Sequence, residues 1–448
     1  MCPSARTFPY PDNMGGVLSF PACGGFCSCT FPLLALLASL GLAQPSHETT
    51  SYLAQLCCTT LVFFALAAAP HRTLAPLLAL IAGLAGLVLS GAPALAMLYG
   101  LGGAMMCLAD PGSTDPERLR ARIWAAGMAL LLLAAALLAW QLGLWRWRIV
   151  WPQGSEKEWL LLARLLLWFT WPAWPLALWT LWRWRRQILS RQLHRHLLLP
   201  LWFVLVAVGA TFTTLPSDRA LLLGLPALAA LAAFALPTLS RSVSALIDWF
   251  TLLFFSISAL AIWVIWISTQ TGVPAKPAAN IARLAAGFVP QFSPLALIMA
   301  LAASAAWCAL VWWRAGRHRA AIWKSLVLPA GGATLSWLLL MTLWLPMLDY
   351  ARSDAPQMRR IVAVIGHPSC VLMHGLSRSQ VASLQYHGKL QLQTMDSGDS
   401  CPWLVLDETP DASRQTGHPD MGQWTLQGRF ARPTDKKDFL SVYRRNRP

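Results

Sequence analysis

The stretch LLLMTLWLPMLDYARSD, residues 338–354, marks the point where the character of the chain changes. On its amino-terminal side, long apolar runs alternate with short breaks that are basic or rich in proline. On its carboxyl-terminal side, the chain is polar and charged, and its apolar runs are short enough to be strands. The sequence therefore predicts a helical membrane portion followed by a module that folds in water.

The composition of the whole chain is that of a membrane protein. Mean hydropathy is +0.51. Of the 448 residues, 56% are hydrophobic and 12% are charged, whereas soluble domains carry roughly 25% charged residues. Runs such as 125–142 and 246–267 approach the roughly 20 apolar residues that cross a bilayer. Because lipid offers the backbone no hydrogen-bond partner, we expect each span to be a helix.

We expect about eleven transmembrane helices within a domain that covers residues 31–345. They are residues 31–44, 52–69, 73–89, 92–108, 122–144, 158–181, 197–214, 219–239, 246–268, 294–313 and 325–345. Residues 1–30 are atypical, and we expect them to be poorly ordered. Their cysteines, Cys23, Cys27 and Cys29, lack a partner at finger-like spacing, so no metal site is expected.

The net charge of +16 is concentrated in the short loops 118–122, 183–195 and 314–324. By the positive-inside rule these loops face the cytoplasm, so the charge does not indicate nucleic acid. With the amino end inside, an odd number of spans puts the C-terminal module outside. The sequence thus predicts a multi-pass protein of a bacterial inner membrane with a periplasmic C-terminal module.

The C-terminal module, residues 346–448, reads as a small α/β unit. Buried strands are predicted at 360–365, 369–373 and 403–407, and edge strands at 424–430 and 439–443. Short helices are predicted at 354–360 and 377–384. Cys370 and Cys401 are the only cysteines of this module. In an oxidising periplasm we expect them to form a disulfide, with two free thiols as the alternative.

Signatures of soluble enzymes are absent: the sequence has no P-loop, GxSxG, HExxH or GxGxxG motif. This argues against an ATP-driven pump. We therefore expect any catalytic residues to be ionisable side chains in the outer loops. Glu48, between the first two spans, is a candidate general base or metal ligand, and a solvated loop carboxylate is the alternative.

A polar cluster, Ser217, Asp218 and Arg219, separates two apolar spans on the outer side. A guanidinium binds two phosphate oxygens at once, which suits a lipid-linked phosphate. Asp218 is a second weak candidate for catalysis, and an interfacial anchor with a local Asp–Arg pair is the alternative. The preceding outer loop carries three further basic residues, Arg146, Arg148 and Lys157. They are candidates to increase the positive electrostatic potential near this cluster. Residues 279–288 are expected to form an amphipathic helix on the membrane surface, with a simple connector as the alternative.

Three segments resemble the GT-C membrane glycosyltransferases, in the bacterial branch related to the protein O-mannosyltransferases and the lipid A aminoarabinose transferase. They are AGLAGLVLSGAPAL (82–95), SDRALLLGLPALA (217–229) and LWLPMLDYARS (343–353). The resemblance implies transfer of a sugar from a polyprenyl phosphate carrier to a lipid or protein acceptor. It also implies a base that deprotonates the acceptor and often a divalent cation. Arg219 is the one residue that we carry over, as a contact of the carrier phosphate.

The chain departs from that family in two places. The family's acidic catalytic residues lie in a large first outer loop, and residues 1–30 offer nothing comparable. The family's phosphate-binding lysine is replaced by Ser90 and Gly91. Two alternatives follow: the start of the chain is truncated or altered, or catalysis has been lost. A transporter or flippase of a lipid-linked saccharide and a non-catalytic membrane scaffold remain as other functions.

Overall fold

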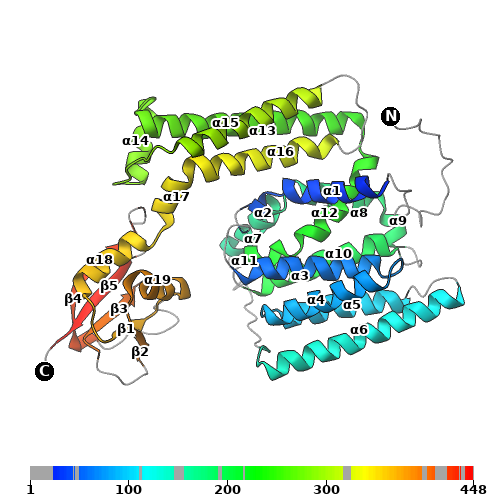
Figure 1. The fold of residues 1–448 in the computed structure, drawn as a ribbon, viewed down its shortest axis with the longest axis horizontal. Helices are drawn as coiled ribbons and strands as arrows, with labels where there is room; N and C mark the ends of the chain where they lie inside the picture. Colours follow the sequence, from blue (N-terminus) through cyan, green and yellow to red (C-terminus); the bar gives the residue numbers. More distant parts are fainter. Residues whose placement is uncertain are drawn as a thin grey trace. The chain divides into compact units, whose positions relative to one another are not determined.

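Apolar helices make up most of the computed structural model (Figure 1). The described residues are 24–43, 45, 50–109, 114–145, 156–189, 194–214, 217–315, 324–395, 401–408, 421–432, 434 and 439–446. The chain divides into two units. The N-terminal unit contains residues 1–256 and 305–337, and the C-terminal unit contains residues 257–304 and 338–448.

The N-terminal unit is a bundle of helices. Its helices are α1 (Gly24–Ala38), α2 (Leu40–Ala43), α3 (Ser51–Ala68), α4 (Leu74–Leu89), α5 (Pro93–Ala109), α6 (Asp115–Gln141), α7 (Glu156–Phe169), α8 (Ala173–Arg183), α9 (Arg185–Ile188), α10 (Arg195–Thr213), α11 (Ser217–Leu222) and α12 (Leu225–Ala235), the last followed by a 3-10 turn, Leu236–Thr238. Three further helices run through both units: α13 (Arg241–Thr271), α15 (Pro294–Ala315) and α16 (Lys324–Leu339).

Six described helical segments are long and apolar enough to cross a membrane, and seven if the bent pair α7–α8 counts as one span. Large apolar side chains on these helices face outward; Leu130 and Ile257, for example, are 68% and 63% exposed. Exposure of so much apolar surface is unfavourable in water but not in lipid. The chain is therefore a multi-pass helical membrane protein, as predicted. The expected number of about eleven spans is not confirmed.

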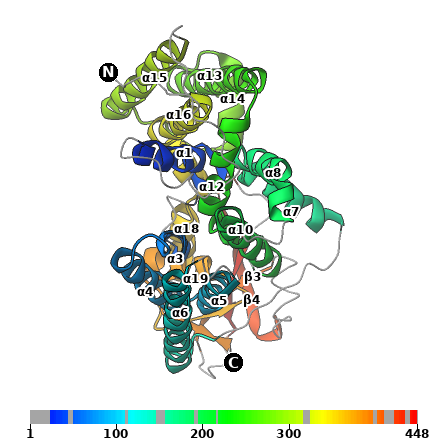
Figure 2. The same ribbon diagram turned by 90° about the vertical axis from the view of Figure 1, so that its right-hand side faces the viewer.

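Helices α3, α4, α5 and α6 lie side by side with α10 in the N-terminal unit (Figure 2). Their shared core is apolar, with Val62, Leu66 and Leu87 almost fully buried. At its centre the rings of Tyr99 and Phe203 stack with centroids 4.2 Å apart. This core joins residues from α3, α4, α5, α6 and α10, together with Ala227 of α12.

Two arginines cover the carboxyl end of α3. Arg195, at the start of α10, donates to the Leu66 carbonyl at 2.8 Å, and Arg120 on α6 donates to the Ala69 carbonyl at 3.3 Å. The last carbonyls of a helix have no partner within the helix, and cations are favourable there. The ring of His196 lies 5.9 Å from Phe234 near the end of α12. We call this end of the N-terminal unit the Arg195 end.

Asp248 on α13 and Arg314 on α15 form an ion pair within the N-terminal unit. Both side chains are largely buried, at 17% and 21% exposed. An isolated charge at that depth would be costly, so each residue supplies the counter-charge of the other. The pair fastens the first turns of α13 to the last turn of α15.

Three predicted spans are not single straight helices. The segment predicted at 31–44 covers the end of α1 and all of α2, which are separated at Ser39. The segment predicted at 158–181 is α7 and α8, which meet at an angle of 87°. Pro172, which has no backbone N–H to continue a helix, stands at the bend. The segment predicted at 219–239 is α11 and α12, separated at Leu223 and Gly224. In addition, helix α1 begins at Gly24, within the segment 1–30.

The C-terminal unit contains a five-stranded mixed sheet in the order β2-β1-β3-β5-β4. Its strands are β1 (Val371–His374), β2 (Leu392–Thr394), β3 (Trp403–Asp407), β4 (Trp424–Ala431) and β5 (Phe439–Arg445). The first three strands are parallel, and β5 and β4 are antiparallel to their neighbours. The edge strand β4 carries an irregularity between Leu426 and Gly428, where one residue has no partner on β5.

Helices α18 (Ala355–Ile365) and α19 (Arg378–Gly388) accompany the sheet, while α14 (Ala275–Leu284) and α17 (Leu345–Arg352) complete the unit. A π-helical turn, Leu340–Trp344, precedes α17. The Tyr350 hydroxyl donates to the Ala286 carbonyl at 2.8 Å, and the Thr434 hydroxyl donates to the Ala351 carbonyl at 2.6 Å. These two bonds connect α17 with the loop after α14 and with the sheet module.

The α/β prediction for the module is confirmed in its main elements, and two details are wrong. Residues 360–365 belong to helix α18 and not to a strand, because Met358, Ile361 and Ile365 recur at helical spacing and are buried together. The strand at 439–443, predicted at an edge, lies between β3 and β4. The amphipathic helix predicted at 279–288 is α14, which begins earlier and ends at Leu284.

Cys370 and Cys401 form a disulfide between the approach to β1 and the approach to β3, with Cα atoms 5.4 Å apart. Cys401 is fully buried beside Leu404 and Trp424. The bridge spans 31 residues of sequence. By the chain-entropy model, a loop of this length stabilises the module by about 3–4 kcal/mol.

We therefore expect the module of the double variant Cys370→Ser, Cys401→Ser to become susceptible to protease at a lower temperature than the module of the unmodified protein. The measurement is limited proteolysis of purified protein along a temperature gradient, followed by mass spectrometry of the fragments. Cys308→Ser serves as the control, since this exposed free thiol on α15 forms no bridge. Equal protease resistance of the double variant and the control would contradict the prediction.

Candidate functional site

Three breaks in helices characterise the N-terminal unit. The first separates α1 from α2 at Ser39, the second separates α7 from α8, and the third separates α11 from α12 at Gly224. Helix α2 contacts α7, and α11 contacts both of them. Figure 1 shows α2, α7 and α11 together at one end of the helices of this unit, with α9 toward the other. Segments that are distant in sequence therefore place their irregular backbone in one region.

The first two breaks are held together by backbone contacts. The Leu40 amide donates to the Trp171 carbonyl at 3.0 Å, and the buried Ser39 hydroxyl donates to the Ala35 carbonyl at 2.9 Å. Gly41 packs directly against the Phe169 ring, where an added Cβ would stand 2.3 Å from a ring carbon. Only a glycine permits this close approach without a shift of the ring.

The third break is buried between α10 and the first break. Leu222 and Leu225, on its two sides, are fully buried in a cluster with Ala35 and Leu176. An added Cβ on Gly224 would stand 2.9 Å from the Cβ of Ala207 on α10. Irregular backbone is tolerated at membrane depth only where protein buries it or water reaches it. The burial of these breaks satisfies that condition.

The end of α4 lies at the same end of the bundle. Gln55, on the first turns of α3, donates through Nε2 to the Ser90 carbonyl at 2.9 Å. Because α11 also contacts α3, the segments 82–95 and 217–229 approach a common helix. Trp159 on α7 lies against Phe212 at the end of α10, with ring centroids 6.0 Å apart. We call this region, opposite the Arg195 end, the α11 end.

The predicted site residues divide into three groups. Arg219 lies on α11 with a half-buried side chain, and Lys157 lies exposed on the first turn of α7. The structure therefore brings these two to the α11 end. Ser217 and Asp218 begin α11, but their side chains are outside the described part of the chain. Glu48, Arg146 and Arg148 lie wholly outside the described residues.

Sequence reasoning missed an acidic pair at the α11 end. Glu156 and Glu158 stand on the first turn of α7, and the side chain of Glu158 is half-buried. The signal in the sequence is the triplet Glu156-Lys157-Glu158 at the start of the predicted span 158–181. The contact of α7 with α11 places these carboxylates in the same region as Arg219.

The chemistry available at the α11 end is that of fixed charge and proton transfer. A half-buried guanidinium binds an anion such as a phosphate, and a half-buried carboxylate accepts a proton. Within the described residues, no group of three or more His, Cys, Asp or Glu side chains could hold a metal ion.

Comparison with known proteins gives one structural likeness. No family model and no curated protein sequence matches the chain. ArnT from Cupriavidus metallidurans, solved bound to undecaprenyl phosphate, aligns with 16% identity and a TM-score of 0.49, over 93% of this chain and 78% of that chain. Its apo form aligns with 15% identity and the same TM-score and coverage.

We expect Gly41→Ala to loosen the junction of the first two breaks, because the new Cβ would overlap the Phe169 ring. Overpacking of this kind typically costs about 1–3 kcal/mol. The measurement is the melting temperature of the purified protein in detergent. Gly127→Ala on α6 is the matched control, since a Cβ there meets nothing within 4 Å. A melting temperature that is unchanged by Gly41→Ala would contradict the packing described here.

Proposed function

We propose that the chain is an inner-membrane glycosyltransferase that moves a sugar from a polyprenyl phosphate carrier to a lipid or protein acceptor on the periplasmic side. The observation that carries the proposal is the gathering of three helix breaks around α11, the helix that carries the half-buried Arg219. The sequence resemblance of residues 217–229 supplies the class of substrate.

The helix breaks matter because they create a polar region in an otherwise apolar bundle. A straight helix uses its backbone groups internally and has none to offer a substrate. A break frees N–H and C=O groups, and in lipid these need protein or water as partners. A region with three breaks and a half-buried arginine is therefore suited to a substrate that is lipid at one end and polar at the other.

In the proposed reaction Arg219 holds the carrier phosphate. The acceptor oxygen or nitrogen attacks the anomeric carbon, the bond from that carbon to the phosphate oxygen breaks, and the phosphate leaves with the electron pair. Arg219 and Lys157 compensate the charge that develops on the leaving phosphate. The acceptor proton passes to a carboxylate, for which we propose Glu158, on the helix that contacts α11.

The proposed sidedness follows from the distribution of charge over the N-terminal unit. Arg120, Arg185 and Arg195 belong to the end of the bundle that lies opposite α11. If these residues face the cytoplasm, as the positive-inside rule expects, α11 faces the periplasm. The chain enters its last predicted span from the basic loop 314–324, so the same rule expects the C-terminal module to be periplasmic, where a disulfide is stable.

A flippase for a lipid-linked saccharide is the second candidate. Discontinuous helices also build substrate sites in transporters, and α7–α8 is a discontinuous pair with an 87° bend. This candidate predicts exchange of labelled lipid-linked saccharide across proteoliposomes without transfer to an acceptor.

We expect Arg219→Ala to weaken binding of a polyprenyl phosphate at least tenfold, since a charged hydrogen bond to phosphate would be lost. Consumption of a radiolabelled polyprenyl-phosphate sugar by membranes that contain the variant should be lost as well. Arg219→Lys should retain part of the binding, because lysine keeps the charge without the bidentate geometry.

Arg283→Ala is the matched control for this experiment. Arg283 is an exposed arginine on α14 that donates to the Asn280 side chain at 3.2 Å. Full consumption of the labelled sugar by Arg219→Ala would reject the proposed role of the residue. Saccharide exchange in liposomes without any transfer by the unmodified protein would favour the flippase.

A further inference from the structure

The C-terminal module contains a polar pocket at the carboxyl ends of its parallel strands. The pocket encloses about 230 Å³ and is lined by Asp354, Gln357, Ser377, Ser379, Gln380, Arg432, Phe439 and Leu440. The chain leaves β1 through α19 and enters β2, which lies on one side of β1 in the sheet. Strand β3 lies on the other side of β1 and is followed along the chain by β4 and β5. Ligands of open α/β sheets bind at such a switch point.

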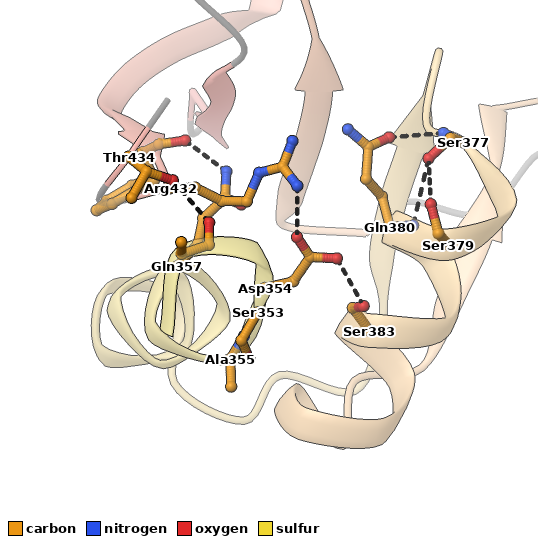
Figure 3. Close-up of polar contacts among 12 residues, drawn as sticks. Ser353, Asp354, Ala355, Gln357, Ser377, Ser379, Gln380, Ser383, Arg432 and Thr434 are labelled. Atoms are coloured by element: carbon orange, nitrogen blue, oxygen red, sulfur yellow. Dashed lines mark hydrogen bonds and ion pairs between the residues drawn. The ribbon is translucent and has the colours of Figure 1, made fainter. Parts of the chain in front are cut away.

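Asp354 and Arg432 form the charged part of the lining (Figure 3). The Arg432 guanidinium stands 3.7 Å from one oxygen of the Asp354 carboxylate, and the Ser383 hydroxyl donates to the other oxygen at 3.0 Å. Charge-assisted hydrogen bonds are usually about 2.7–2.9 Å long. The ion pair is therefore loose enough for a ligand hydroxyl to donate to the carboxylate and accept from the guanidinium.

The first turn of α19 forms the opposite side of the pocket (Figure 3). Ser377 caps the helix: its hydroxyl accepts from the Gln380 amide at 3.3 Å, and its own amide donates to the Gln380 side chain at 2.6 Å. The hydroxyls of Ser377 and Ser379 lie 3.0 Å apart. Gln380 also donates to the buried Asp407 at the end of β3, at 2.9 Å. These hydrogen bonds hold the polar side chains of the pocket in place in the absence of a ligand.

The balance of charge in the pocket favours a neutral ligand. Arg432 and the amino terminus of α19 attract an anion, but Asp354 lines the same pocket and Asp407 lies directly behind Gln380. A phosphate would offer acceptors only and would meet these carboxylates at close range. A polyol offers donors to Asp354 and acceptors to Arg432, and brings no charge.

Size and shape narrow the ligand to one small ring. Pockets that bind drug-sized molecules measure roughly 300–1,000 Å³, and this pocket is smaller. Phe439 adds an aromatic ring to the lining, and Gln357, which is 5% exposed, adds an amide whose Nε2 donates to the Phe430 carbonyl at 2.7 Å. An aromatic face beside charged and amide groups suits a ring that has apolar C–H faces and a hydroxylated rim.

We propose that this pocket binds one neutral pyranose unit of a saccharide. Asp354 accepts hydrogen bonds from ring hydroxyls, Arg432 donates to them, and the ring packs on Phe439. The site is separate from the α11 end and does not depend on sugar transfer by the N-terminal unit. It gives the C-terminal module a saccharide-binding role of its own.

The test is saturation-transfer NMR with the full-length protein and a panel of methyl pyranosides and N-acetylated pyranosides. The detergent must be non-glycosidic, because maltoside detergents carry the ligand that is being tested. Ser379→Trp places a large side chain in the pocket from an exposed helix position. Gln385→Trp is the matched control, since Gln385 is an exposed residue on α19 that does not line the pocket.

We expect signal transfer to at least one pyranoside with the unmodified protein and with Gln385→Trp. Ser379→Trp should abolish it. Asp354→Asn, which keeps the shape and removes the charge, should weaken the affinity roughly tenfold. Melting temperatures of the variants establish that each is folded.

Three results would overturn the proposal. The first is the absence of signal from every pyranoside with the unmodified protein, and the second is an equal signal with Ser379→Trp. The third is binding of inorganic phosphate that Ser379→Trp abolishes while no pyranoside binds, which would make the pocket an anion site. None of these results depends on whether Arg219 takes part in sugar transfer.

Discussion

Backbone hydrogen bonding in a solvent without hydrogen-bond partners governs this structure. Along the straight helices each N–H and C=O is satisfied within the helix, and the outward faces are apolar. Between the first two breaks, the Leu40 amide donates to the Trp171 carbonyl at 3.0 Å. At the third break, the Leu223 and Gly224 amides donate within the turn, to the Ala220 and Leu221 carbonyls. Close packing of the neighbouring helices covers these breaks.

The same requirement separates the two ends of the N-terminal unit. At the Arg195 end the free carbonyls of α3 are bound by arginine side chains from α6 and α10. At the α11 end, three helix breaks lie close together, and the side chain of Arg219 is half-buried. The proposed substrate site is at the α11 end because the helix breaks gather there.

Much of the fold could be predicted because apolar runs of membrane length permit only helices. The breaks were harder to predict: Pro172 and Gly224 stand inside apolar runs, and composition alone does not distinguish a bent helix from a straight one. The run at 360–365 was short enough to fit a strand or a helix, and the helical spacing of Met358, Ile361 and Ile365, which begins before the run, distinguishes the two. The proposed phosphate contact, Arg219, was identifiable from its polar neighbours, whereas the proposed base, Glu158, was recognised only from the contact of α7 with α11. The proposed pyranose pocket joins residues 354, 377 and 439, which no local pattern connects.

The irregularity in β4 affects how readily the module can associate with a second copy of itself. An exposed edge strand with continuous pairing offers its free backbone groups to any similar strand nearby. Around Gly428 the pairing of β4 shifts by one residue, and the charged Arg429 follows immediately. A second molecule that approached this edge would meet an interrupted ladder, with a charged side chain close to the exposed Leu426. The bulge therefore disfavours self-association of the module through this edge strand.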